Sequence, residues 1–388
     1  MAKRQLNIAL VGYQFMGKAH SNAYRQVGRF FDMDVEPVLK VICGRNEQKV
    51  QAAQHLFGWQ EYATNWEDLI GRDDIDIIDI GTPNNTHAMI SQAALKAGKH
   101  VLCEKPLAIN VADARMSYDV ATSSGLVNGI CHNYRFVPGI AYAAQLVREG
   151  KLGKIRHFRG VYLQDWIVNE AVPLVWRLDK SIAGSGSHGD LNAHLIDTAR
   201  FVMGTEFTNV MGMSETFIKQ RPLLADTGGG LAGFTASGES GTVSVDDVTA
   251  FLARFQNGAT GTFEATRLAP GRKNYNFWEI NGEKGSIVYN QERMNEFEIY
   301  LTEDPEGVRG FHRVQSTESF MPYMSAYWPV AHIIGYEHTF INMVYDFLRA
   351  VSLGTQFSPD FQDGYRNQAV LEAVDISCAS EKWVTPEL

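Results

Sequence analysis

The first third of the chain repeats one pattern of hydrophobic and polar positions. Short continuous aliphatic runs, typical of strands buried on both faces, alternate with longer segments whose apolar residues follow helical spacing. Strands alternating with helices predict a doubly wound parallel α/β sheet. The predicted strands are residues 6–11, 38–43, 75–81, 100–103 and 126–131. Of the predicted helices, the first ends near residue 27, the second spans residues 46–57, the third ends at residue 98 and the fourth begins near residue 110.

The pattern changes near residue 132 to longer strands, some of them paired across hairpin signals such as Asn257-Gly258. We therefore expect two domains, residues 1–131 and 132–388, the second an α+β domain with a large, mostly antiparallel open sheet and helices on one face. Residues 228–241, rich in Gly, Ser and Thr, are expected to form a mobile loop. The predicted elements are a helix at 138–149 and strands at 155–165, 248–255, 259–265, 277–281 and 286–289.

One stretch of the second domain combines a glycine-rich loop, residues 184–189, with a polar stripe on a predicted helix. Asp190, His194 and Asp197 follow at i, i+4 and i+7, while leucines follow similar spacing on the neighbouring face. Such a helix can bury one side and present an acid and an imidazole to a cavity. The alternative is an aspartate that stabilises the helix dipole and a histidine bonded to a carbonyl. Asp197 is expected to lie behind the residues that contact the substrate, where a structural role is slightly favoured.

The first predicted strand ends at Gly12, and Gly12-Tyr13-Gln14-Phe15-Met16-Gly17 opens a helix. Strand, glycine turn and helix form the Rossmann context for dinucleotide binding, because N–H groups at a helix start can hold a pyrophosphate. Gln14 replaces the usual middle glycine, so its side chain should push the pyrophosphate outward or bind it through the amide. A plain turn between strand and helix is the alternative.

Gly44-Arg45-Asn46 follows the second predicted strand, where NAD-binding chains usually carry an acid for the ribose 2′-hydroxyl. A small residue followed by arginine makes room for a 2′-phosphate and supplies a charge to pair with it. The cofactor is therefore expected to be NADP or NAD, with NADP slightly favoured. A solvated surface arginine is the alternative.

Glu104-Lys105-Pro106 follows another predicted strand end, the side on which open α/β sheets bind ligands. The proline restricts the backbone of Lys105 to extended conformations, so its ammonium can be held in one direction. A cation there can orient a substrate hydroxyl beside a nicotinamide, with Glu104 as its structural partner. A surface lysine before a loop is the alternative.

Composition excludes several classes of function. The chain has 388 residues and a net charge of −9 without a long basic run, which argues against nucleic acid and anionic membranes as partners. No apolar run reaches the length of a membrane span and the start does not resemble a signal peptide, so a cytoplasmic location is expected. The four cysteines are far apart and are interpreted as reduced packing residues. His188, His332, Glu337 and His338 lack the spacing of a zinc helix, and no metal is expected.

The glycine turn, Thr82-Pro83-Asn84, Glu104-Lys105-Pro106 and the Asp190/His194/Asp197 helix, in this order, resemble the glucose–fructose oxidoreductase/inositol 2-dehydrogenase (Gfo/Idh/MocA) family over nearly the whole chain. Residues 162–166, Trp176-Arg177 and 335–337 most resemble its levoglucosan dehydrogenases and related bacterial sugar dehydrogenases. The resemblance implies that His194 removes a hydroxyl proton while a hydride leaves the same carbon, that Lys105 orients the oxygen, and that Asp190 maintains the site's geometry and charge. The expected cofactor-binding residues are Gly12, Gln14, Phe15, Met16, Gly44, Arg45, Asn46, Thr82, Pro83, Asn84, His87, Glu104 and Lys105.

Polar and aromatic groups near the second domain's first strand suit a sugar, which offers both hydroxyls and a C–H face. For each of them a packing or surface role is the alternative. The expected substrate-binding residues are Lys105, Asn133, Arg135, Gln164, Asp165, Trp166, Arg177, Asp190 and His194.

Three functions remain open at this stage. The first is an NAD(P)-dependent dehydrogenase acting on a ring hydroxyl of a sugar, anhydrosugar or cyclic polyol. The second is a nicotinamide-dependent glycosidase that cleaves by transient oxidation and elimination, which would release an aglycone without accumulating reduced cofactor. The third is a non-catalytic cofactor-binding regulator, which has no use for a proton acceptor such as His194. The open sheet and the resemblance both lead us to expect a homodimer or homotetramer.

Overall fold

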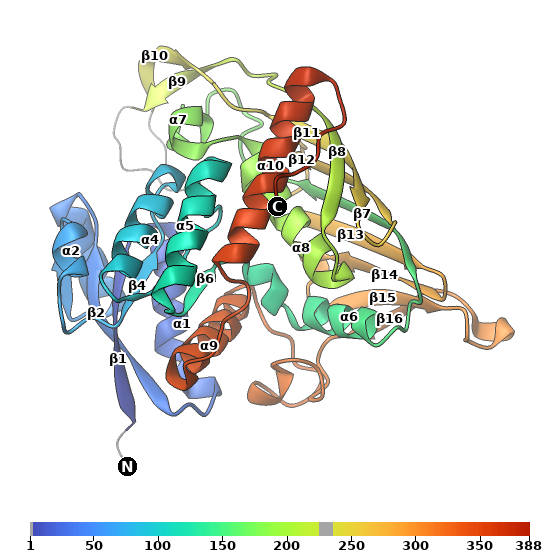
Figure 1. Ribbon diagram of the computed structural model, residues 1–388, viewed down its shortest axis with the longest axis horizontal. Helices are drawn as coiled ribbons and strands as arrows, with labels where there is room; N and C mark the ends of the chain where they lie inside the picture. Colours follow the sequence, from blue (N-terminus) through green and yellow to red (C-terminus); the bar gives the residue numbers. More distant parts are fainter. Residues whose placement is uncertain (1–2, 225–235) are drawn as a thin grey trace. The chain divides into compact units, whose positions relative to one another are not determined.

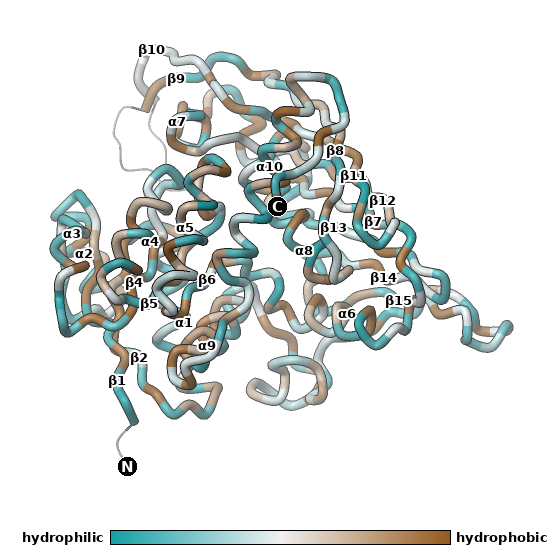
Figure 2. The backbone as a smooth tube through the Cα atoms, viewed as in Figure 1, coloured by the Kyte–Doolittle hydropathy of each residue, from teal (hydrophilic) through white to brown (hydrophobic). Residues whose placement is uncertain are grey.

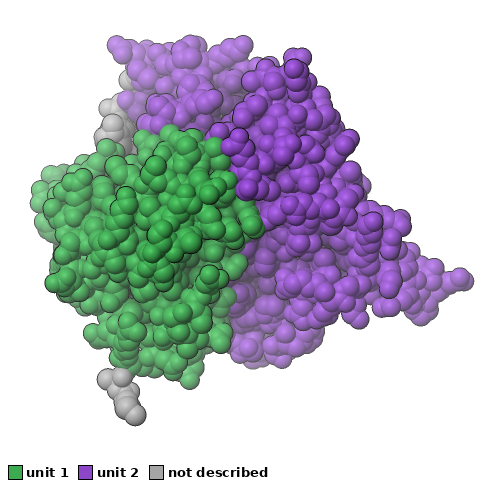
Figure 3. Space-filling view, in the orientation of Figure 1, with its two compact units in different colours: residues 1–133, 230–232, 335–368 green, residues 134–229, 233–334, 369–388 purple. Residues whose placement is uncertain are grey.

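The computed structural model describes residues 3–224 and 236–388, which form two compact units. The described part of the first unit comprises residues 3–133 and 335–368, and that of the second comprises residues 134–224, 236–334 and 369–388 (Figure 3). The sequence boundary between residues 131 and 132 lies close to the end of the first segment. Residues 335–368, which the sequence analysis assigned to the second domain, belong to the first unit.

Within the described residues, the first unit contains a six-stranded parallel sheet in the order β3-β2-β1-β4-β5-β6 (Figure 1). Because the strand order reverses direction between β1 and β4, ligands are expected at the carboxyl ends of these two strands. The strands are β1 Arg4–Val11, β2 Val35–Cys43, β3 Glu61–Ala63, β4 Ile77–Ile80, β5 His100–Cys103 and β6 Asn128–Ile130. The predicted doubly wound sheet is confirmed.

Helices cover both faces of this sheet. Its inner strands are hydrophobic (Figure 2), and every residue of β4 is buried, as expected for a strand covered on both sides. Helix α9, Glu337–Leu353, packs against α1, Phe15–Phe30, far from it in sequence. The remaining helices of this unit are α2 Glu47–Phe57, α3 Glu67–Ile70, the 3₁₀ turn η1 Asn84–Thr86, α4 His87–Lys96, α5 Val111–Ser124 and the start of α10, Phe361–Ser380.

Within the described residues, the second unit contains an eight-stranded sheet in the order β16-β15-β14-β13-β7-β12-β11-β8. Its neighbours are antiparallel except β7 and β12, which confirms the predicted mostly antiparallel sheet. Residues of β12 alternate between exposed and buried, so one face of the sheet is covered and the other open. The strands are β7 Ile155–Leu163, β8 Phe207–Glu215, β11 Val248–Phe255, β12 Thr260–Thr266, β13 Tyr275–Gly282, β14 Gly285–Asn290, β15 Glu296–Leu301 and β16 His312–Gln315.

Helix α8, Ala193–Met203, packs against β7 on the covered face, and α6, Pro138–Arg148, packs against α8. A short antiparallel pair, β9 Gln220–Leu224 and β10 Ala236–Thr242, stands apart from the large sheet. The mobile loop predicted for residues 228–241 is wrong from Ala236 onward, where the chain forms β10. The small residues of this strand give only a weak alternation of polar and apolar positions. Residues 228–235 lie outside the described residues. None of the described helices is long and apolar enough to cross a membrane.

Candidate functional site

The glycine turn after β1 has the close backbone approach that a dinucleotide site needs. Gly12 has φ +117°, and a Cβ at this position would lie 2.4 Å from the carbonyl oxygen of Gly81, at the end of β4. Gln14 occupies the N-cap of α1 without capping it through its side chain, and both Gln14 and Phe15 are exposed. The first turn of α1 therefore presents backbone N–H groups and a glutamine amide at the switch point of the sheet.

The turn after β2 differs from its sequence interpretation. A Cβ at Gly44 would lie 2.1 Å from the ring of Tyr13, so the missing side chain makes room for this ring rather than for a 2′-phosphate. Asn46 caps α2, with its Oδ1 accepting a hydrogen bond from the Lys49 N–H at 3.0 Å. Burial raises the pKa of Tyr13, and the positive charge of Arg45 opposes that rise. Arg45 itself is exposed, which leaves it as the group at this turn suited to an anionic ligand.

His87 joins the loops that follow β4 and β5. Its Nδ1 lies 2.7 Å from the Pro106 carbonyl oxygen and its Nε2 lies 2.8 Å from the Thr82 carbonyl oxygen. Burial lowers the pKa of His87, and the hydrogen bonds to the Pro106 and Thr82 carbonyl oxygens oppose that fall. The expected cofactor contact of His87 does not fit this arrangement, because both ring nitrogens face backbone carbonyls. We interpret it as the residue that holds the Thr82-Pro83-Asn84 turn beside the lysine loop.

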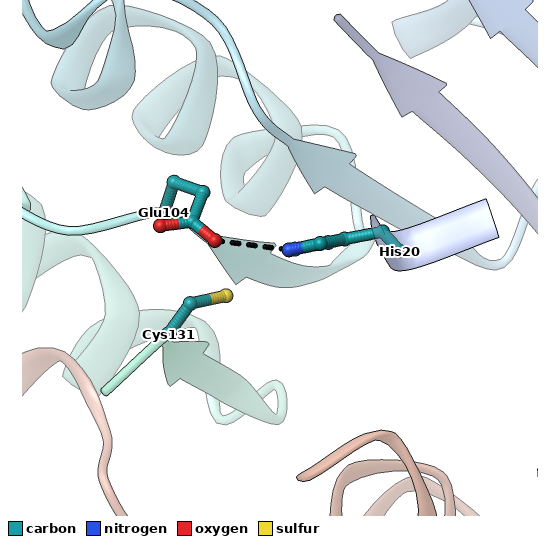
Figure 4. Close-up of side chains that lie close together, drawn as sticks. All are labelled: His20, Glu104 and Cys131. Atoms are coloured by element: carbon teal, nitrogen blue, oxygen red, sulfur yellow. Dashed lines mark hydrogen bonds and ion pairs between the residues drawn. The ribbon is translucent and has the colours of Figure 1, made fainter. Parts of the chain in front are cut away.

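Glu104 is likewise buried and bonded to groups of the first unit. The residue is buried, and its Oε1 lies 2.9 Å from His20 Nε2 (Figure 4), while its Oε2 accepts a hydrogen bond from the Lys105 N–H at 3.2 Å. These contacts place Glu104 behind the backbone of Lys105, which is itself half-buried. Cys131 lies beside this pair. His20, which follows Gly17 by three positions on α1, was not among the expected site residues.

In the second unit, the carboxylate of Asp246 accepts hydrogen bonds that hold the glycine-rich loop, residues 184–189, in place. Asp246 Oδ1 accepts from the Gly186 N–H at 2.6 Å, and its Oδ2 accepts from the Ser187 hydroxyl at 2.6 Å and the His188 N–H at 2.8 Å. A Cβ at Gly186 would lie 1.9 Å from the Asp246 carbonyl oxygen, so glycine is required there. Charge-assisted bonds of this kind explain why the loop can hold the following helix in place.

The helix after this loop begins with a π-helical turn, His188–Asn192, and becomes α-helical at Ala193. Such turns are often found at functional sites. The i, i+4, i+7 stripe expected for Asp190, His194 and Asp197 assumed a continuous α-helix, whereas Asp190 lies within the π-helical turn and the other two residues lie on α8. Asp190 is half-buried with its Oδ2 3.5 Å from Arg267 Nη1, whereas Asp197 is buried and paired with Arg135.

His194 is the centre of an aromatic and polar cluster. The side chain is 8% exposed, and its ring centroid lies 4.6 Å from that of Tyr134 and 5.9 Å from that of Tyr162. The two tyrosine hydroxyls are 2.8 Å apart, and Tyr162 donates to Asn274 Oδ1 at 2.7 Å. Gln164 donates to the same oxygen at 3.0 Å, which joins an expected substrate residue to the cluster.

Four residues of this region were not among the expected site residues: Tyr134, Tyr162, Asn274 and Arg267. The alternation of β7 could have placed Tyr162 on the covered face of the sheet. Arg267 follows β12 and Asn274 precedes β13, both far from His194 in sequence, and no local pattern marks either residue.

The other expected substrate residues have partners within their own units. Asn133 donates to the Thr339 hydroxyl at 2.9 Å, and Arg135 forms a two-pronged ion pair with Asp197. Asp165 accepts from Lys273 Nζ at 2.6 Å. Trp166 packs against a small apolar cluster and lies under the Arg267 guanidinium, and the Arg177 guanidinium lies over the ring of Trp176. Asn133 and Arg135 are thus both buried and bonded to partners within their own units.

Both units match known families. Residues 6–132 match an oxidoreductase family's NAD-binding Rossmann fold, and residues 140–288 match the GFO/IDH/MocA C-terminal domain. The chain is 42% identical to a levoglucosan dehydrogenase from Pseudarthrobacter phenanthrenivorans over 386 residues, 98% of each chain.

Solved structures resemble the whole chain as well. An oxidoreductase domain protein from Kribbella flavida superposes with a TM-score of 0.94 at 44% identity, covering 99% of this chain and 100% of that one. A levoglucosan dehydrogenase in complex with NADH and levoglucosan superposes with a TM-score of 0.93 at 41% identity, covering 99% and 100%.

Proposed function

The chain belongs to the Gfo/Idh/MocA family of NAD-binding oxidoreductases, and we propose that within it the protein oxidises a ring hydroxyl of an anhydrosugar, with levoglucosan as the first candidate. The protein is a nicotinamide-dependent sugar oxidoreductase. The observation that carries the choice of substrate is the similarity to levoglucosan dehydrogenase, which extends over both units and nearly all of each chain.

The first unit fits a nicotinamide dinucleotide at the turn after β1. Gly12 leaves space that a Cβ would fill, and the exposed first turn of α1 offers N–H groups to a pyrophosphate. Gln14 with Phe15 and Met16 on this turn, together with Thr82-Pro83-Asn84 after β4, would hold the cofactor. When bound, its nicotinamide ring accepts the hydride released from the substrate carbon.

The chain's own residues supply the proton chemistry. His194, packed against Tyr134, accepts the proton of the substrate hydroxyl through its imidazole, the side chain most often used as a general base. The Lys105 ammonium holds the hydroxyl oxygen and stabilises the negative charge that develops on it. Asp190, beside Arg267, contributes a negative charge that favours protonation of the imidazole. We propose these roles from the family resemblance and from the surroundings of each side chain.

We predict that Lys105→Met lowers kcat/KM for the sugar about 100-fold, the typical loss when one donor to a developing oxyanion is removed. The dissociation constant of the cofactor should change less than about twofold, since a charge on the substrate oxygen contributes only to the reaction. Initial rates of nicotinamide reduction and cofactor titrations measure both quantities. Lys96→Met, at an exposed position of α4, is the matched control and should leave both unchanged. Wild-type turnover in Lys105→Met would contradict the proposed site.

The glycosidase and regulator hypotheses are separated by one measurement. Similarity to named dehydrogenases favours net oxidation. Incubation with both cofactors and a panel of anhydrosugars, polyols and glycosides should yield one reduced nicotinamide for each sugar oxidised. Release of an aglycone without reduced nicotinamide would instead establish cleavage, and tight cofactor binding without turnover on any of them would establish a regulator.

The choice between NAD and NADP rests on two opposing observations. The related levoglucosan dehydrogenases contain NADH, which supports NAD. The prediction that NADP is slightly favoured now depends on Arg45 alone, because Tyr13 fills the room at Gly44. The chain binds a nicotinamide dinucleotide in either case.

We predict that Arg45→Ala raises KM for NADP about 10- to 100-fold, because it removes a charged hydrogen bond worth about 1.5–3 kcal/mol. KM for NAD should change less than about twofold, since NAD has no 2′-phosphate. Steady-state rates with each cofactor at a saturating sugar concentration measure the ratio. Arg29→Ala, at the exposed end of α1, is the control. Equal effects on the two cofactors would show that Arg45 does not read the 2′-phosphate.

We further propose that the open face of the large sheet forms a subunit interface. Leu252 on β11 and Met211 on β8 are paired in register, and both are exposed, as is Met213 nearby. Adjacent exposed apolar side chains on the open face of a sheet are typical of such interfaces. They support the expected homodimer or homotetramer. A cytoplasmic location is likewise proposed, because nicotinamide cofactors and four unpaired cysteines both suit a reducing compartment.

A further inference from the structure

A chain of buried polar side chains in the first unit leads from α1 to the loop that carries Lys105. His20 is 0% exposed, and its Nδ1 lies 2.8 and 2.9 Å from the two carboxylate oxygens of Asp79 on β4. Its Nε2 lies 2.9 Å from Glu104 Oε1, and Figure 4 shows the two side chains pointing toward each other. Tyr24 donates its hydroxyl to Asp79 at 2.8 Å. The function proposed above uses none of these groups directly.

The surroundings of His20 require a charged ring. Each ring nitrogen faces a carboxylate, which only accepts hydrogen bonds, so both nitrogens carry a proton. Burial lowers the pKa of His20, but the charges and hydrogen bonds of Asp79 and Glu104 outweigh burial and raise the pKa from 6.5 to about 10. One buried positive charge therefore lies between two buried negative charges at neutral pH.

The contact continues from Glu104 to the backbone of Lys105. Glu104 Oε2 accepts from the Lys105 N–H at 3.2 Å, and the Glu104 N–H donates to the Ile80 carbonyl oxygen at 2.8 Å. On the other side of Lys105, the Pro106 carbonyl oxygen lies 2.7 Å from His87. The lysine is thus the half-buried residue between two segments that buried groups hold in place.

We propose that His20 is a positioning residue: as a buried imidazolium it fixes the Glu104 carboxylate and, through the Lys105 N–H, the direction of the Lys105 ammonium. This inference rests on the proposed function, in which Lys105 holds the substrate oxygen. A displacement of about 1 Å in such a group can cost about 100-fold in rate, so a fixed backbone matters for a long flexible side chain.

A metal ion is the competing occupant of this cluster. Possible ligand atoms of His20, Glu104 and Cys131 lie within 4.8 Å of one another, and Asp79 behind the histidine resembles the outer carboxylate of many metal sites. A metal would need a bare Nε2 and a thiolate. The Nε2–Oε1 distance is already that of a hydrogen bond, and burial raises the pKa of the Cys131 thiol well above its ordinary range. These observations favour a proton, and not a metal ion, between His20 Nε2 and Glu104 Oε1.

The groups around His20 come from several elements, and their charges determine how the carboxylates respond when His20 is replaced. Asp79 on β4 and Glu104 after β5 are the facing carboxyl groups, Cys131 follows β6, and the ring of Phe340 on α9 lies 5.5 Å away. In His20→Gln the two carboxylates lose the cation between them, so the pair should bind a proton at low pH and release it as pH rises. Asp79→Asn added to His20→Gln removes one of the two charges and should relieve the repulsion.

The test is a cycle of His20→Gln, Asp79→Asn and the double variant, with Lys105→Met as reference. We expect His20→Gln to lower kcat/KM for the sugar about 10- to 100-fold at neutral pH, with a further fall as pH rises, while the cofactor dissociation constant changes less than about twofold. The double variant should recover about tenfold of this loss and its pH dependence should flatten. Nitrogen NMR of histidine-labelled wild type should show a signal, absent in His20→Gln, that stays doubly protonated as pH passes through neutrality.

Each other outcome overturns the inference. Wild-type kinetics in His20→Gln would show that Lys105 does not depend on it. A loss equal at every pH, accompanied by a lower melting temperature and without recovery in the double variant, would show a purely structural role. Stoichiometric metal in the purified protein that disappears in His20→Gln would identify a metal ligand. Full activity of Lys105→Met would instead reject the proposed function, whatever the His20 variants do.

Discussion

Replacement of His194 by alanine is expected to lower kcat about 10²- to 10⁴-fold, the range typical for loss of a general base. The imidazole is nearly buried, and the rings of Tyr134 and Tyr162 pack around it, so alanine leaves a gap that water fills without the basicity of imidazole. Cofactor affinity should stay within about twofold, because the proton is removed from the substrate alone. Initial rates of nicotinamide reduction and direct cofactor titration measure the two effects.

A control and a rescue experiment sharpen this prediction. His332→Ala, at an exposed position, should have wild-type kinetics. Free imidazole added to His194→Ala should restore part of the rate, since the cavity can accept a small base of the same chemistry. Retention of the wild-type kcat in His194→Ala would reject its role as proton acceptor, and equal losses of cofactor affinity and rate would indicate damage to the fold.

The second large effect concerns stability. Asp197→Ala is expected to lower the free energy of unfolding by about 3–5 kcal/mol, because the partner Arg135 is left buried with an uncompensated charge. The two side chains are 7% and 3% exposed, and Arg135 Nε donates to Asp197 Oδ2 at 2.8 Å. Denaturant titration followed by fluorescence measures the loss as a lower midpoint.

The charge-balanced variant separates loss of the ion pair from loss of packing. Arg135→Met combined with Asp197→Leu replaces both charges by apolar side chains and should be far closer to the wild-type midpoint than Asp197→Ala. Arg115→Ala removes an exposed pair with Asp119 and should change the free energy of unfolding by less than about 1 kcal/mol. A loss of that small size in Asp197→Ala would contradict the buried-pair argument.

Much of the fold could be predicted because its signals are local. β4 is a short run of isoleucines, interrupted by Asp79, that is buried along its whole length, and the hairpin at Asn257-Gly258 joins β11 and β12 as expected. Helices α2 and α5 begin one residue after their asparagine caps, which sequence also marks. The strand β10 was missed because Gly, Ser and Thr give no clear alternation.

The candidate site could be predicted only in part. Gly12, Lys105, Asp190 and His194 stand out because a strand end, a glycine loop or a helix gives each a recognisable position. Arg135 resembled a sugar-binding residue until its partner, 62 positions away, was known. Glu104 likewise resembled a cofactor ligand, although it faces His20, 84 positions earlier.

The sequence by itself determined the order of elements, the class of both sheets and the residue types available for hydride and proton chemistry. These depend on periodicity and turn chemistry within a few residues, where steric and hydrophobic preferences act directly. Only the tertiary structure decided that Tyr13 fills the space at Gly44, that Asp190 lies in a π-helical turn ahead of α8, and that His20 lies between two carboxylates. Which partner a side chain meets depends on packing between distant segments, and the charge and direction of a buried group follow from that partner.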